Sequence, residues 1–62
     1  MTARTPWVRV SGNVAAAMLG NVNIAQFAHE SAAENFRRAV ALCQSWPEWN
    51  GEPIRVERSC AS

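Results

Sequence analysis

The sequence predicts a small α+β fold, in which a mostly antiparallel sheet with the element order βββαβ carries one amphipathic helix on one face. Three observations predict this fold. Apolar residues alternate near both ends of the chain, two Gly-Asn pairs divide its first half, and a helical pattern fills its second half. With 62 residues, the chain is expected to form a single domain, residues 1–62, whose own core is small.

The first half of the chain is expected to form a meander of short strands. Val8, Arg9 and Val10 alternate in polarity as a half-buried strand does, and each Gly-Asn pair fits a two-residue hairpin turn. Direct pairing across the turns predicts three strands, at residues 7–11, 14–19 and 22–28. In this register one face collects apolar side chains, and a one-residue slip would scatter them. These residues are Val8, Val10, Ala15, Ala17, Leu19, Val22 and Ile24.

The segment SAAENFRRAVALCQSW, from Ser31 to Trp46, predicts the helix. Ser31 and Glu34 form a capping box, in which the hydroxyl accepts from the third helical amide and the carboxylate reaches back to the Ser31 amide. Pro47 ends the helix. At about 100° per residue, one side of the helix is an apolar stripe. The stripe contains Ala32, Phe36, Ala39, Cys43 and Trp46, with Val40 and Leu42 beside it.

The end of the chain predicts a last strand. Residues 47–53 are rich in turn-forming residues, and the alternation then resumes from Ile54 to Arg58. Ile54 and Val56 are expected to join the inner face of the sheet and to pack under the helix.

An all-helical alternative stays open at this point. Residues 14–19 are rich in alanine, which favours helix, and Asn13 and Gly20 suit the two ends of a short helix. The stretch from Ala16 to Gly20 looks like the first helix and the turn glycine of a helix-turn-helix. Against that motif, Gln26 stands where a buried aliphatic residue is needed.

The residue content gives no sign of catalysis. His29 is the only histidine, and the nearby Ser31 is explained as the helix cap. Cys43 and Cys60 do not combine with His29 in the paired spacing of a metal site, although a Cys43–Cys60 disulfide stays open as an alternative to a reduced, buried Cys43. We therefore expect no enzyme, no cofactor and no metal site. No apolar run is long enough for a signal peptide or a membrane span, which predicts a cytoplasmic protein.

The face of the sheet without a helix is the first candidate for function. The predicted register places Trp7, Arg9, Val14, Ala16, Met18, Ala25 and Phe27 on it. Aromatic residues, methionine and arginine are enriched at the cores of interfaces, which indicates an exposed docking face. The alternative is that the loop containing Trp46 and Trp49 folds over this face.

Two further surfaces complete the candidate site. Trp46-Pro47-Glu48-Trp49 either anchors a partner or staples the loop to the end of the helix. Arg37 and Arg38 on the outer helix face, with Arg55 and Arg58, suit contacts to phosphates or acidic side chains, and the alternative is that they form a solvated face. The residues predicted to contact a partner are Trp7, Arg9, Met18, Phe27, Arg37, Arg38 and Trp49.

In size and layout the chain resembles small inhibitors carried by phages and mobile elements, such as anti-CRISPR proteins. The resemblance spans WVRV, the two Gly-Asn turns, SAAENFRRAVALCQSW and PIRVER, and it is one of architecture without a diagnostic motif. It implies a non-enzymatic module, as a monomer or a homodimer, that covers the surface of a host nucleoprotein complex. The alternative is a small DNA-binding regulator of the ribbon or helix-turn-helix type. Direct nucleic-acid binding is the less favoured, because the formal net charge is only +1 and glutamates lie among the arginines.

Overall fold

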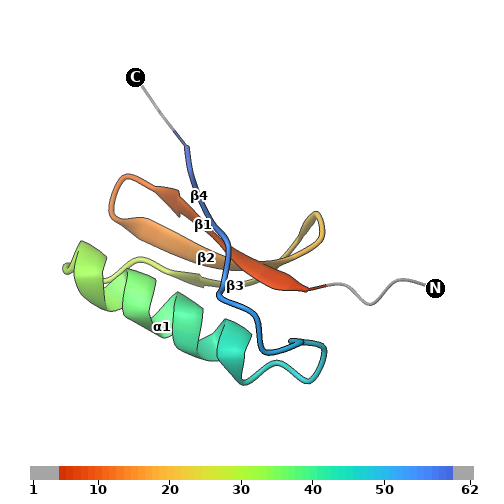
Figure 1. The fold of residues 1–62 in the computed structure, drawn as a ribbon. Coiled ribbons are helices and arrows are strands. Elements are labelled where there is room, and N and C mark those ends of the chain that lie inside the picture. The colour runs from red at the N-terminus through yellow and green to blue at the C-terminus, as the bar shows by residue number, and fades with distance from the viewer. Residues whose placement is uncertain (1–4, 60–62) are drawn as a thin grey trace.

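The computed structural model describes residues 5–59 and confirms the α+β fold (Figure 1). Residues 14–19 form a strand, so the all-helical alternative and the helix-turn-helix are both wrong. Alanine is the strongest helix former, but intrinsic propensity is a weak determinant of structure, and pairing with a strand on each side overrides it. The elements are β1 (Pro6–Ser11), β2 (Val14–Leu19), β3 (Val22–Phe27), α1 (Ala32–Gln44) and β4 (Val56–Arg58).

The strands form one four-stranded sheet in the order β3-β2-β1-β4. β1 and β2 pair antiparallel, as do β2 and β3, whereas β4 returns parallel to β1. α1 crosses one face of this sheet, and the opposite face carries no helix (Figure 1). Gly12 and Gly20 both have a φ of 62°, and no other residue type in the described part has a positive φ. A glycine at the first central position is typical of the type II′ turn that joins twisted strands.

A β-bulge in β3 changes which residues face the helix. The β1–β2 register runs from Ser11 opposite Val14, as direct pairing across the turn predicts. Between β2 and β3 the predicted register holds only as far as Met18 opposite Asn23 and then shifts, so that Ala17 faces Ala25 and Ala15 faces Phe27. One extra residue in β3 therefore turns Ala25 and Phe27 to the helix side. The prediction that both lie on the helix-free face is wrong.

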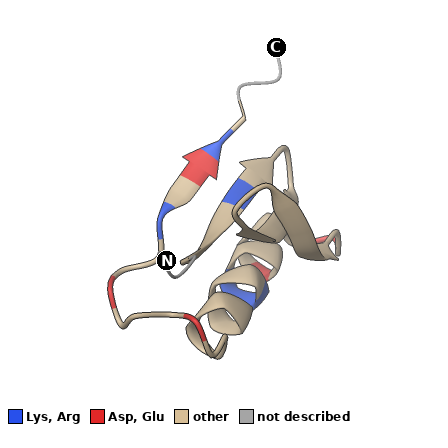
Figure 2. Cartoon of the chain, turned by 90° about the vertical axis from the view of Figure 1, so that its right-hand side faces the viewer, with Lys and Arg blue, Asp and Glu red and all other residues tan. Residues whose placement is uncertain are grey.

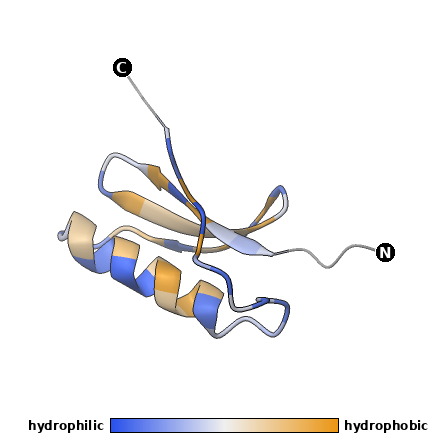
Figure 3. Ribbon diagram, viewed as in Figure 1, coloured by the Kyte–Doolittle hydropathy of each residue, from blue (hydrophilic) through white to orange (hydrophobic). Residues whose placement is uncertain are grey.

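The core lies between the sheet and α1. Its fully buried members are Val8, Ala15, Ala17, Ala39 and Cys43, and half-buried apolar residues pack around them. Ile54, Val56 and Phe36 are among these, as the sequence predicts, and Phe27 joins them because of the bulge. Figure 3 shows the apolar residues of α1 alternating with polar ones along its length. Three of the five fully buried members, Ala15, Ala17 and Ala39, are alanines, so small side chains make up the centre of this core.

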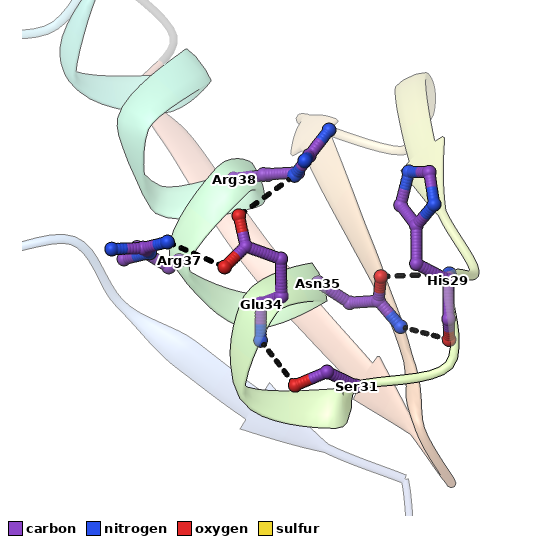
Figure 4. A network of polar contacts seen from close by, with 6 residues as sticks. All are labelled: His29, Ser31, Glu34, Asn35, Arg37 and Arg38. Atoms are coloured by element: carbon purple, nitrogen blue, oxygen red, sulfur yellow. Dashed lines mark hydrogen bonds and ion pairs between the residues drawn. The ribbon is translucent and has the colours of Figure 1, made fainter.

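Asn35 ties two loops to the helix from a fully buried position (Figure 4). Its carbonyl oxygen accepts from the amide of His29 at 2.8 Å, and its amide donates to the carbonyl oxygens of His29 and Asn13. Asn13 belongs to the β1–β2 turn, and His29 follows β3. A buried asparagine with all these bonds made fixes where the helix begins relative to the sheet.

The start of α1 confirms half of the predicted capping box. The Ser31 hydroxyl accepts from the Glu34 amide at 3.2 Å. The Glu34 carboxylate does not reach back to Ser31; it pairs instead with Arg37 and Arg38 one turn further along the helix (Figure 4). Two guanidiniums at favourable spacing compete successfully with one backbone amide.

Candidate interaction site

The helix-free face of the sheet combines an apolar centre with a charged margin. In the observed register, Trp7 lies beside Met18 and Arg9 beside Ala16 on β1 and β2. Glu57 of β4 lies opposite Arg9, and the amide side chains of Asn23 and Gln26 in β3 lie opposite Met18 and Ala16. Charge is therefore confined to the β1–β4 side of this face.

Trp7 and Met18 are buried, so the prediction that this face exposes them is wrong. Their exposed fractions are 7% and 3%, and they form a second apolar cluster with Ala16. The Trp7 indole Nε1 donates to the carbonyl oxygen of Gly20 at 3.0 Å, which directs the ring towards the β2–β3 turn. An indole with a satisfied N–H can lie against the sheet as a cover for its neighbours.

Two arginines complete the cover over Trp7. The guanidinium carbon of Arg55 lies 4.7 Å from the indole ring centroid, and that of Arg9 lies 5.5 Å away. Both distances are within the range of cation–π attraction. Neither predicted alternative, a bare apolar face or a face covered by the Trp46–Trp49 loop, describes this arrangement. The long arginine side chains of the sheet itself shield the tryptophan and present their charges to solvent.

These side chains border a shallow depression of about 400 Å³, lined by Thr5, Trp7, Arg9, Gly20, Asn21, Arg55 and Glu57. Glu57 partly neutralises it, because its carboxylate lies 3.4 Å from Nε of Arg55. Two guanidiniums still face one carboxylate, and Arg9 forms no ion pair in the described part of the chain. Among the strands, Figure 2 shows charged residues on β1 and β4 and none on β2 or β3, with a further charged residue on the segment before β4. The depression is therefore suited to an anionic group.

Arg37 and Arg38 lie away from this depression, on the helix that covers the opposite face of the sheet. Both are already engaged by Glu34, with Nε of Arg38 at 2.9 Å from Oε2 and Arg37 on Oε1 (Figure 4). The hydrogen bonds from Arg38 and then Arg37 lower the pKa of the Glu34 carboxyl from its ordinary value of 4.5. The structure does not bring these arginines together with Trp7 and Arg9.

The loop after α1 uses its two tryptophans internally. Nε1 of Trp49 donates to the carbonyl oxygen of Glu52 at 2.7 Å, and Nε1 of Trp46 donates to the Glu48 carboxylate at 3.2 Å. Both rings are half-buried, and neither lines the depression around Trp7. The geometry supports the alternative in which these residues staple the loop. Trp49 stands apart from the depression formed around Arg9, Arg55 and Trp7, which we call the arginine site.

In the part of the chain that the structure describes, the residues with reactive side chains are not gathered into a site. Among residues 5–59, no group of three or more His, Cys, Asp or Glu side chains is placed to hold a metal ion. Cys43 is a buried free thiol whose Sγ lies 3.5 Å from the carbonyl oxygen of Trp7, and burial raises its pKa. Cys60, and with it the alternative of a Cys43–Cys60 disulfide, lies outside the described residues.

Arg55 is the main member of the site that the predicted contact residues omit. The alternation from Ile54 to Glu57 already places Arg55 and Glu57 on the side away from the core. Only the sheet order adds that β4 lies next to β1, which brings Arg55 onto Trp7.

The burial of Asn35 could have been predicted from its position in the helix. It stands four residues before Ala39 and eight before Cys43, on the buried side of the helix.

No helix among residues 5–59 has the length and apolar character needed to cross a membrane. Comparison with protein-family models, with curated protein sequences and with solved structures finds no match to this chain.

Proposed function

We propose that this chain is a non-enzymatic protein-binding module that docks on an acidic surface of its partner through the β1–β4 side of its helix-free face. One observation carries the proposal: Arg9 and Arg55 are both held against Trp7 and direct their guanidiniums to solvent. Arginine binds carboxylates through two parallel hydrogen bonds. Side chains that are already positioned lose less conformational freedom when they bind.

The proposal has a narrower form that rests on size and layout. In it, the partner is a host nucleoprotein complex, and the chain acts as a phage or mobile-element inhibitor by covering that complex. The DNA-binding alternative survives only in its ribbon form, because the same guanidiniums also suit phosphates.

The test compares two probes on the intact chain: a glutamate-rich peptide and a short DNA duplex. Binding is followed by the NMR signal of the Trp7 indole N–H and by isothermal titration calorimetry. We expect the peptide to shift the indole signal, and the double variant Arg9→Gln/Arg55→Gln to weaken peptide binding by about tenfold or more. Arg37→Gln/Arg38→Gln removes the same charge from the helix and is the matched control.

Two outcomes would overturn the proposal. Equal weakening by both double variants would mean that only overall charge matters. Tighter binding of duplex than of peptide, with a steep dependence on salt and a loss in Arg9→Gln/Arg55→Gln, would favour the ribbon-type regulator instead.

A further inference from the structure

β3 is a sheet edge without the features that normally protect one. It is six residues long and lies at the end of the strand order, so one side of its backbone has no strand partner in the described chain (Figure 1). No Asp, Glu, Lys or Arg occurs from Val10 to His29. Val22 is 54% exposed, and no other large apolar side chain in the described part is as accessible to solvent. Proteins usually guard such edges with charges, proline or short length.

The opposite edge has these guards. β4 is three residues long, Pro53 precedes it, and Arg55, Glu57 and Arg58 lie along it. An added strand would therefore be accepted at β3 and discouraged at β4. One usable edge in each molecule leads to a closed pair and not to an open chain of copies.

The bulge selects what can pair with β3. Asn23 and Gln26 lie on the same face although they are three residues apart, and Nδ2 of Asn23 donates to Oε1 of Gln26 at 3.4 Å. In a regular strand, residues on one face are separated by an even number of positions. A regular strand from another protein would therefore lose its pairing register with β3 at the bulge. A strand with the same extra residue would keep its register along the whole of β3.

We propose that β3 pairs antiparallel with β3 of a second copy of this chain about a two-fold axis that passes between Ile24 and Ala25. This register sets Val22 against Phe27 of the second copy, both on the helix side of the sheet. It sets Asn23 against Gln26 of the second copy, both on the helix-free side. Apolar residues meet apolar ones, amides meet amides, and the two bulges face each other. The two helices then lie on the same side of a continuous sheet.

This dimer does not depend on the proposed function, since the arginine site lies on the β1–β4 side of the sheet. The first test is the molar mass of the chain by light scattering and sedimentation from about 1 µM to about 1 mM, the range in which weak dimers form. We expect a monomer–dimer equilibrium. Val22→Lys should raise the dissociation constant by about tenfold, because two copies of an apolar cross-strand pair are lost. Ser59→Lys adds the same charge beside β4 and should leave the constant unchanged.

The second test reads the register directly. Asn23→Cys and Gln26→Cys are made separately in a Cys60→Ser background and then oxidised alone and as a mixture. The proposed register places the two new thiols opposite each other only in the mixture, which should give a disulfide-linked heterodimer. A monomer at every concentration would overturn the proposal. A dimer that is insensitive to Val22→Lys, or one that cross-links equally well in the separate samples, would overturn it too.

Discussion

At one edge of the sheet β4 is three residues long and is lined by arginine and glutamate, whereas at the other edge β3 is six residues long and uncharged. The difference begins in the sequence, where no Asp, Glu, Lys or Arg lies between Arg9 and Glu30. It continues on the helix-free face, where arginines cover Trp7 on the β4 side and neutral amides lie on the β3 side. A charged edge resists the addition of a further strand, whereas an uncharged edge leaves its backbone groups open to one.

Trp7→Ala is expected to have the largest effect on stability, because the Trp7 ring joins the charged edge to the centre of the sheet. Removing a buried tryptophan costs about 3–5 kcal/mol, which is close to the whole stability of a chain of this size. Urea denaturation followed by circular dichroism would measure the loss. Trp7→Phe keeps a ring and should retain more than half of the stability. A loss below about 1 kcal/mol in Trp7→Ala would contradict the burial of Trp7.

Asn35→Ala is expected to act at the β3 end of the molecule. It leaves the amide of His29 and the carbonyl of Asn13 without their partner, at a cost of about 2–3 kcal/mol, while the carbonyl of His29 keeps its bond from Nδ2 of Asn13. Hydrogen exchange should accelerate first at residues 27–30 and in the β1–β2 turn, and last at β4. Gln44→Ala, at an exposed helix position, is the control and should change little. Acceleration that begins at β4 would mean that Asn35 does not secure the loop after β3.

Phe27→Ala tests the bulge, which decides the face on which β3 displays this ring. Because Phe27 packs against the core beside α1, its loss should cost about 2 kcal/mol, below the full value for a completely buried ring. Gln26→Ala, on the opposite face, should stay within about 0.5 kcal/mol of the wild type. If Phe27→Ala and Gln26→Ala both reduced stability by the same small amount, the result would favour a β2–β3 register without the bulge. Urea midpoints measured at one low protein concentration keep dimer formation out of the comparison.

Much of the fold follows from local sequence, because the signals it needs are local. Ser31, the apolar stripe of α1 and the glycines of the two hairpin turns each depend on neighbours within a few residues. The β1–β2 register also follows, because direct pairing across the two-residue turn continues along both strands without a bulge. The bulge does not follow, because Val22-Asn23-Ile24-Ala25 alternates acceptably without it. What favours the bulge is the packing of Phe27 under α1, a contact between elements.

The candidate site was harder to predict for a related reason. The exposure of Trp7 depends on side chains from another strand, and Arg55 reaches it only because β4 lies parallel to β1. Nothing local in Ile54-Arg55-Val56 states which strand it will join. Arg37 and Arg38 look like free contact residues in the sequence, yet the carboxylate that engages them is Glu34, three and four positions earlier on the same helix.

The smallest expected effect concerns this Glu34 cluster, which lies on the helix and apart from both edges. Hydrogen bonds from Arg38 and Arg37 lower the pKa of the Glu34 carboxyl in the folded chain. The contribution of these bonds to the stability of the fold is therefore complete at a pH above 4.5, the ordinary pKa of the group. It is lost as the pH falls through the lowered folded value, because the protonated carboxyl no longer pairs. Glu34→Gln should therefore be less stable than the wild type near neutral pH and equal to it in strong acid, with a smaller gap at high salt. Glu30→Gln, which removes an exposed carboxylate that forms no ion pair in the described residues, is the control for the loss of one negative charge. If the stability difference between Glu34→Gln and the wild type grew as the pH fell, the ion pairs would not stabilise the folded chain as expected. A change in hydrogen exchange at β3 or β4 in Glu34→Gln would show that the helix surface and the sheet edges are not independent.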